Sequence, residues 1–373
     1  MEGFLKNYKL RIKVLSPIHV GNGEKIGKKE YINLYREHKV IIPDPVKVYM
    51  ALCDKGLEED YTRYMLHSNL EFGAWLKEKM IGKSEFQKWK RYEMDSGDAF
   101  FGGLSAKGVK PPKEIMSFIK DAYGMPYIPG SSLKGMIRTA LLAYETTHNI
   151  KKYGYISEKI KNNARMKARR EFCLSRETTE LETAVFHTLN REEKKKSNAV
   201  NCCLSGLLVR DSIPISVENL TLCQKIDYTI ERKERPMPIL REALKPGTEI
   251  DFDISIDQTQ CPYTIEDIMA ALEEFQKCMY KYFYSRFGRG TDEKGTVWLG
   301  GGCGFLSKTV LYPVFGEEAV RITDAVFRNT LGKNYDVHKH NKDVSLKIAP
   351  HVCKCTRYDG RLYDMGLGKI EVL

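Results

Sequence analysis

The chain switches between a two-residue and a 3.6-residue hydrophobic period, and this switching limits the folds it can adopt. Residues 8–15 alternate apolar with polar or basic side chains, which predicts a half-buried strand. Residues 264–287 instead carry apolar side chains such as Ile268 and Leu272 at helical spacing. Strands followed by a helix occur early and again late in the chain. This order predicts an α+β fold of two ferredoxin-like (RRM-like) halves with helical insertions.

The predicted division between the halves falls near residue 200. The first half, 1–200, has a charged, mostly helical insertion at about 54–122 and a basic arm at about 151–170. The second half, 201–373, has a glycine-rich loop and a C-terminal extension, whose segment 364–369 we expect to dock on a neighbouring chain. Further strands are expected at 31–35, 39–42, 206–213, 222–230, 248–256 and 309–312.

Composition and charge narrow the class of protein. The chain is 42% hydrophobic and 29% charged, and no run approaches the roughly 18 apolar residues of a membrane span. We therefore expect a cytoplasmic protein with no membrane partner. Its ten cysteines include no CxxC pair, so neither disulfides nor a zinc ribbon are expected. A net charge of +11 favours a polyanionic partner such as a nucleic acid.

Three glycine-containing segments lie where a predicted strand or helix ends: 16–23 (SPIHVGNG), 129–138 (PGSSLKGMIR) and 298–309 (WLGGGCGFLSKT). In the second, Ser131 or Ser132 is predicted to cap a helix whose N-terminal N–H groups attract a phosphate. Lys134 and Arg138 are four residues apart and share one helix face. The segment is not a nucleotide P-loop, because Met136 stands where that motif requires lysine.

The late glycine segment lets a sugar-phosphate backbone approach closely, because four of its residues lack side chains. Phe305 offers a stacking face, and nearby cations add charge. The alternative, an ordinary surface loop with Phe305 packed in the core, stays open on these residues alone. The four residues without side chains are Gly300, Gly301, Gly302 and Gly304, and the cations are Lys308, Arg286 and Arg289.

Together, SPIHVGNG, YIPGSSLKGMIRTALL and GGGCGFLSKT resemble the RAMP superfamily of CRISPR proteins, in order, over residues 8–311. Within it, the chain is similar to the fifth Csm subunit of type III-A effector complexes, the family that caps the 3′ end of the guide RNA. The resemblance implies a non-catalytic subunit without a cofactor. It implies CRISPR RNA as a partner, and other Csm subunits, especially the repeated backbone subunit. It also implies help in 3′ maturation, through a trimming nuclease.

The resemblance also implies the RNA-contacting residues. From the first segment these are His19, Gly21, Asn22 and Gly23. From the second they are Gly130, Ser131, Ser132, Lys134, Gly135 and Arg138, and from the third the glycines, cations and Phe305 named above.

Two other functions remain open from the sequence. One is a RAMP endoribonuclease that processes CRISPR RNA with His19 as general acid or base, since histidine titrates near neutrality. The other is a scaffold that binds only proteins. Asp44, before a predicted helix, is interpreted as a helix cap rather than as a catalytic aspartate.

A zinc site could be built from residues near the C-terminus, but the usual two-residue ligand spacing is missing, so none is assigned. The residues considered are His338, His340, His351, Cys353 and Cys355.

Overall fold

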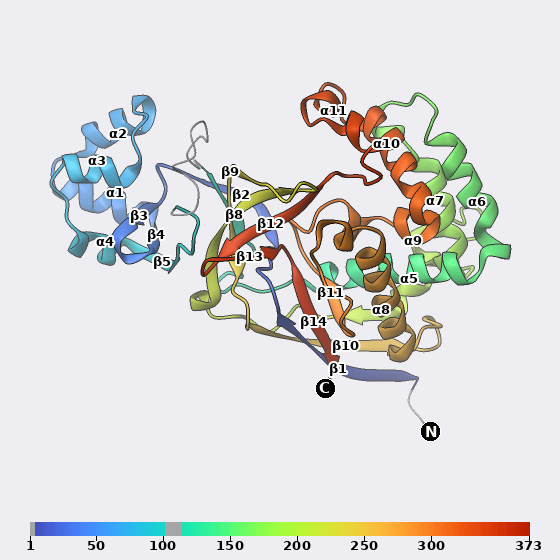
Figure 1. Cartoon of the computed structure of the whole chain (residues 1–373). Coiled ribbons are helices and arrows are strands. Elements are labelled where there is room, and N and C mark those ends of the chain that lie inside the picture. Colours follow the sequence, from blue (N-terminus) through green and yellow to red (C-terminus); the bar gives the residue numbers. More distant parts are fainter. Residues whose placement is uncertain (1–3, 101–113) are drawn as a thin grey trace.

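The structure is a computed structural model that describes residues 4–100 and 114–373. The predicted insertion at 54–122 includes residues 101–113, and that part lies outside the described residues. The described part of the chain combines helices with two curled sheets, as the α+β prediction requires (Figure 1).

The first sheet has five strands in the order β11-β14-β1-β10-β7, and every neighbouring pair is antiparallel. Their bounds are β1 (Leu5–Val14), β7 (Leu207–Val209), β10 (Glu249–Asp257), β11 (Thr296–Trp298) and β14 (Leu367–Val372). Strand β1 lies in the middle because its alternating side chains Leu10, Ile12 and Val14 are buried on one face. The predicted strand at 8–15 is confirmed.

Two long helices, α5 (Gly130–His148) and α8 (Ile265–Tyr282), pack against each other and contact this sheet. Helix α8 begins with a capping box, in which the Thr264 and Asp267 side chains each accept a backbone N–H of the other residue. The ferredoxin-like βαββαβ pattern is formed, in chain order, by β1, α5, β7, β10, α8 and β14. Within the sheet, the four strands lie in the order β14-β1-β10-β7.

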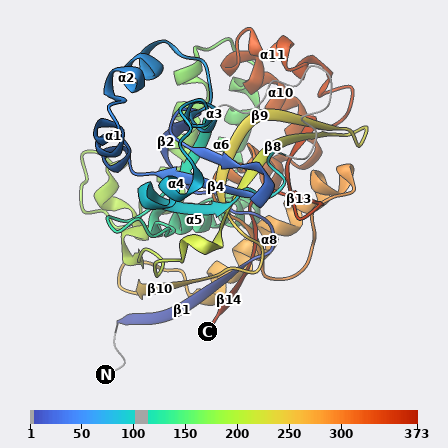
Figure 2. The same ribbon diagram turned by 90° about the vertical axis from the view of Figure 1, so that its left-hand side faces the viewer.

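This ferredoxin-like unit takes strands from both sides of residue 200. Strand β1 pairs with β10 on one side and with β14 on the other, so the predicted boundary does not separate two sheets. The segment 364–369, predicted to dock on a neighbouring chain, instead leads into the internal strand β14. That prediction is wrong because the segment pairs within its own chain, and β14 lies beside β1 (Figure 2).

The second sheet has nine strands, with the main order β2-β6-β9-β8-β5-β4-β3, while β12 pairs with β8 and β13. Their bounds are β2 (Gly21–Gly27), β3 (Ile32–Leu34), β4 (Lys39–Pro43), β5 (Lys90–Asp95), β6 (Glu114–Phe118), β8 (Leu220–Thr229), β9 (Glu234–Leu244), β12 (Val352–Tyr358) and β13 (Arg361–Asp364). Because β5 and β6 belong to this sheet, the predicted insertion is only partly helical.

Four short helices form a lobe with its own core at one end of the molecule (Figure 1). They are α1 (Pro45–Asp54), α2 (Glu58–His67), α3 (Phe72–Glu78) and α4 (Lys83–Trp89). Tyr64 stacks on Trp75 with ring centroids 4.8 Å apart. Asp44 caps α1, since its Oδ1 accepts the N–H of Val46 at 2.9 Å, as predicted.

The remaining helices are α6 (Ile150–Asn163), α7 (Ser175–Phe186), α9 (Leu311–Phe315), α10 (Ala319–Thr330) and α11 (Asn334–Val337). The strand predicted at 309–312 is wrong, because that stretch enters α9. Each of the ten cysteines is a free thiol in the structure. Among the described residues, no helix combines the length and apolar character of a membrane span.

Candidate nucleic-acid interface

The three glycine-containing segments, distant in sequence, meet at one cleft of about 400 Å³. The first segment contributes the end that enters β2, the second the outer face of α5, and the third the loop after β11. The lining residues are Val20, Gly21, Ser131, Ser132, Gly135, Met136, Thr139, Trp298, Leu299, Gly300, Gly301, Ser307 and Lys308. The structure thus brings together the segments that the sequence analysis singled out.

Backbone contact between the first and third segments forms one wall of the cleft. The Gly301 N–H donates to the His19 carbonyl oxygen at 2.7 Å. Gly300 has a φ of +88°, and a Cβ there would lie 2.3 Å from the same oxygen. Only glycine fits this approach, so Gly300 builds the wall whether or not it contacts a ligand.

The face of α5 that lines the cleft carries three hydroxyl side chains, a glycine and Met136. Ser131 and Gly135 are exposed, and a Cβ added at Gly135 would have no atom within 4 Å. The Lys308 side chain is exposed at the cleft and has no hydrogen bond or ion pair with any described residue. Hydroxyl groups, a helical glycine and an uncompensated ammonium group suit a phosphodiester backbone.

Lys134 and Arg138 share a face of α5, as their spacing predicts, but that face turns away from the cleft. The Lys134 ammonium donates to the carbonyl oxygens of Leu204 and Leu207, both at 2.7 Å. Burial lowers the pKa of Lys134. Arg138 Nη2 donates to Glu182 at 2.6 Å. Both cations therefore hold α5 to neighbouring parts of the same chain.

The start of α5 is closed rather than open to an anion. The Gly130 N–H donates to the Asp211 carboxylate at 2.8 Å, and a Cβ at Gly130 would lie 2.2 Å from the Val209 carbonyl oxygen. The residue before the helix is Pro129, and Ser131 and Ser132 lie inside its first turn. The predicted serine cap is therefore wrong, because Asp211 supplies the acceptor from a distant segment.

Several other predicted residues have structural partners. Arg289 forms an ion pair with Asp364 and donates to the Leu362 carbonyl oxygen at 2.9 Å. The Phe305 ring packs edge-on against Phe327 with centroids 5.1 Å apart, so its core-packed interpretation holds in part. Arg286, in contrast, is exposed.

The remaining glycines of the late loop, Gly302 and Gly304, have φ values of +99° and +92°. At Gly302 a Cβ would lie 2.9 Å from Met365. These two glycines shape the loop but do not line the cleft. In the first segment, Asn22 and Gly23 are exposed, and Asn22 lines a neighbouring cleft rather than this one.

His19 is buried, with 5% of its surface exposed. Its Nδ1–H donates to the Glu242 carbonyl oxygen at 2.7 Å. Burial lowers the pKa of His19 to about 4, further than the Glu242 bond raises it. With a pKa of about 4, this imidazole is neutral at pH 7 and only weakly basic, so it is a poor general acid and a poor general base. The geometry therefore assigns His19 to holding the segment in place.

Sequence reasoning missed the Glu242 side chain, which is fully buried beneath this wall. Its carboxylate accepts the Phe118 N–H at 2.7 Å and the Tyr92 hydroxyl at 2.6 Å, and it pairs with Lys120. No local pattern marks Glu242, because its partners come from other strands. Thr139, also missed, follows Gly135 by four residues, and that spacing could have identified it.

The residues considered for zinc divide between two places. His340 and His351 both contact Asp343, whereas Cys353 and Cys355 lie beside Asp364. His338 is exposed. Asp343 and Asp364 were not considered from the sequence, yet the histidines gather around the first and the cysteines around the second.

The basic arm predicted at about 151–170 begins as α6, an amphipathic helix that buries Tyr153, Ile156 and Ile160. Two of its cations are paired: Lys159 with Glu180 and Lys161 with Glu318, both at 2.7 Å. Part of its charge is thus compensated within the chain.

Curated proteins similar to this chain share one name. A protein named CRISPR system Cms protein Csm5 from Streptococcus thermophilus is 28% identical over 83% of this chain and 82% of its own length. A Csm5 protein of Mycobacterium tuberculosis (strain CDC 1551 / Oshkosh) is 26% identical over 100% of this chain and 99% of its own length.

Solved structures share the fold. The crystal structure of T. onnurineus Csm5 covers 96% of this chain and 99% of its own, with a TM-score of 0.61 and 21% identity. A chain in the cryo-EM structure of a Csm–crRNA–target RNA ternary complex of a type III-A CRISPR–Cas system covers 98% of this chain and 100% of its own, with a TM-score of 0.59 and 19% identity. The family model of the RAMP superfamily matches residues 11–307. The chain therefore belongs to the RAMP superfamily.

Proposed function

We propose that this chain is the Csm5-type subunit of a type III-A CRISPR effector complex and binds guide RNA without cleaving it. The observation that carries the proposal is the convergence of the three glycine-containing segments on one cleft. Similarity to Csm5 proteins over 83% and 100% of the chain supports the choice of complex. We further infer that the chain works in the cytoplasm with the other Csm subunits.

We infer that the cleft receives the RNA backbone rather than its bases. Gly135 leaves no side chain in the way, Gly300 allows the wall of the cleft to form, and Lys308 supplies charge for a phosphate. The aromatic rings near the cleft already have partners within the chain, since Trp298 stacks on Tyr284 and Phe305 packs against Phe327. Binding should therefore depend on salt and only weakly on base sequence.

We infer, on the resemblance to Csm5, that the RNA segment bound is the 3′ end of the guide and that a separate nuclease trims it. The endoribonuclease alternative loses support because His19 is buried and its Nδ1 is occupied by the Glu242 carbonyl oxygen. The scaffold alternative predicts no RNA affinity at all.

The test uses the purified full chain and end-labelled CRISPR RNA, in Mg²⁺ and in EDTA, with retention and integrity followed together. We expect salt-sensitive binding of intact RNA, and weaker binding of RNA shortened at its 3′ end than of RNA shortened at its 5′ end. Lys308→Ala should weaken binding, whereas Lys294→Ala, an exposed lysine away from the cleft, should not.

Three other results would each contradict part of this proposal. Site-specific cleavage would support the endoribonuclease, and absence of binding would leave the protein scaffold. Equal affinity for both shortened RNAs would argue against 3′-end capping while leaving RNA binding intact.

A further inference from the structure

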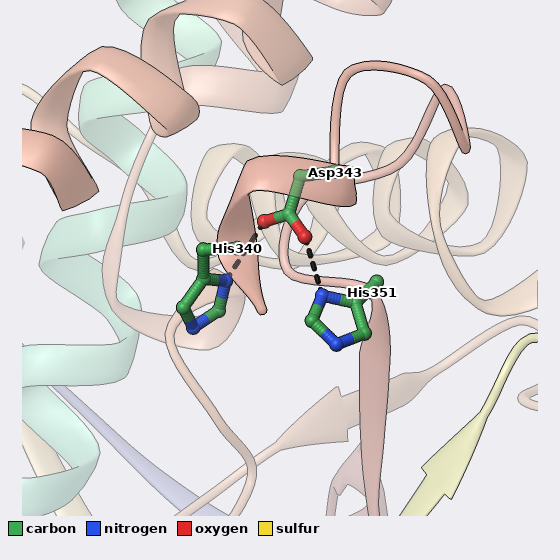
Figure 3. A group of neighbouring side chains, drawn as sticks. All are labelled: His340, Asp343 and His351. Atoms are coloured by element: carbon green, nitrogen blue, oxygen red, sulfur yellow. Dashed lines mark hydrogen bonds and ion pairs between the residues drawn. The ribbon is translucent and has the colours of Figure 1, made fainter. Parts of the chain in front are cut away.

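A fully buried carboxylate lies just before β12, and the Lys and Arg side chains of the described residues do not reach it. The Asp343 side chain is 0% exposed, and its two oxygens contact His340 Nδ1 and His351 Nδ1 (Figure 3). Both histidines are 8% exposed. Burying a carboxylate costs several kcal/mol unless a cation or strong donors compensate it. Among the described residues, only these two imidazoles face the carboxylate, so its compensation depends on what they hold: protons or a metal cation.

The backbone around the three residues is held in place. His340 begins the short 3-10 helix η9 (His340–Lys342), and the Asp343 N–H bonds back to its carbonyl oxygen at 3.0 Å. Next to His351, the Tyr312 hydroxyl bonds both the Ala349 carbonyl oxygen at 2.9 Å and the Ala349 N–H at 3.1 Å. The three ligand-bearing side chains are thus preorganised.

We propose that His340, Asp343 and His351 form a binding site for a divalent transition metal of the zinc class. One nitrogen or oxygen atom from each residue lies within 4.8 Å of the others. Imidazole nitrogen and carboxylate oxygen are zinc ligands at about 2.0–2.2 Å. Three protein ligands leave one tetrahedral position for water or another exchangeable ligand. The metal charge compensates Asp343, which no lysine or arginine of the described residues does.

A second cluster of potential metal ligands differs from the histidine cluster in its surrounding charge. Cys353, Cys355 and Asp364 are also buried and close together. There, however, the Arg289 guanidinium already pairs with Asp364, so the carboxylate is compensated and a metal would meet a fixed positive charge. The histidine cluster lacks such a cation.

The same three residues could instead form a metal-free imidazole–carboxylate network. That network needs Nδ1–H groups that donate to Asp343, whereas a metal needs Nδ1 lone pairs and protons on Nε2. The two states differ in tautomer as well as in metal content, so measurement separates them.

The metal would join η9 to the start of β12 and so stabilise the segment between α10 and β12. Helix α10, which precedes this segment, contacts the basic arm, because Asn329 Nδ2 donates to the Met166 carbonyl oxygen at 2.9 Å. Metal binding would then raise the melting temperature in a concentration-dependent way.

The test titrates ZnCl₂ into the full chain after EDTA treatment and dialysis, by calorimetry, with metal content measured by mass spectrometry. We expect one zinc per chain, a higher melting temperature, and visible d–d absorption when cobalt(II) replaces zinc. Asp343→Asn, which keeps shape but removes charge, should weaken binding at least about 100-fold. His340→Gln provides a second ligand variant if Asp343→Asn does not fold.

Two controls separate this site from adventitious binding: Cys353→Ser at the second cluster, and His148→Gln at an exposed histidine. Both should bind zinc as the unmodified chain does. Failure of the unmodified chain to bind micromolar zinc would overturn the proposal. Unchanged binding in Asp343→Asn or His340→Gln, or loss of binding in Cys353→Ser, would do so as well.

Discussion

Two faces of α5 differ both in their side chains and in what those side chains contact. The face with Ser132, Gly135 and Thr139 lines the cleft, whereas the face with Lys134 and Arg138 packs on its own chain. The sequence predicts RNA contact for Lys134, Gly135 and Arg138 alike. In the structure, Gly135 lines the cleft, whereas Lys134 and Arg138 bond to their own chain. A side chain can bind a ligand only where it is not already bonded within the fold.

The largest effect should come from the packed face. Lys134→Met removes the donor to two carbonyl oxygens and should lower the free energy of unfolding by about 2–4 kcal/mol. Arg138→Ala, whose ion pair is partly exposed, should cost about 1 kcal/mol. Denaturant unfolding measures both. Unchanged stability together with lost RNA affinity in Lys134→Met would mean that this face binds RNA after all.

The second effect is a pH dependence of stability that comes from His19, in the wall of the cleft formed by the first and third segments. His19 is neutral in the folded chain down to about pH 4, whereas its ordinary pKa is 6.5. Between these values the unfolded chain binds the additional proton, so stability falls as the pH falls. The loss should reach about 2 kcal/mol by pH 5. His19→Asn should remove this part of the pH dependence, and superimposable pH curves for the two chains would contradict it.

The third effect contrasts Lys308 with Arg138 in RNA binding. Lys308→Ala should weaken affinity about tenfold and reduce the salt dependence by about one counterion. It should not change stability, because Lys308 has no ion pair among the described residues. Arg138→Ala should leave the salt dependence as it is. Filter binding over a salt series gives both slopes, and equal changes in the two variants would erase the distinction between the faces.

The smallest effect concerns Gly135, where a Cβ meets open space. Gly135→Ala should stabilise α5 by about 0.5–1 kcal/mol and hardly change RNA affinity. Gly135→Gln keeps the helix but fills part of the cleft, so it should bind RNA more weakly than Gly135→Ala. Thermal unfolding and filter binding on the same samples provide the test. Equal affinity in both variants would show that RNA does not approach this glycine.

Local patterns in the sequence determined much of the secondary structure. The alternation in β1, the capping box of α8 and the Asp44 cap are short-range features, each set by the residues within one or two turns. The three motif segments were also recognisable from their glycines, since close backbone approach and positive φ restrict the residue type.

Only the tertiary structure decided which groups are free and which are used. The pairing of β14 with β1 joins residues more than 350 positions apart, and the caps and ion pairs of α5 come from Asp211 and Glu182. Asp343 likewise gathers two histidines that spacing alone grouped with cysteines. Local sequence sets backbone preference, but the partners of a buried charge are set by whichever distant segments the core brings beside it.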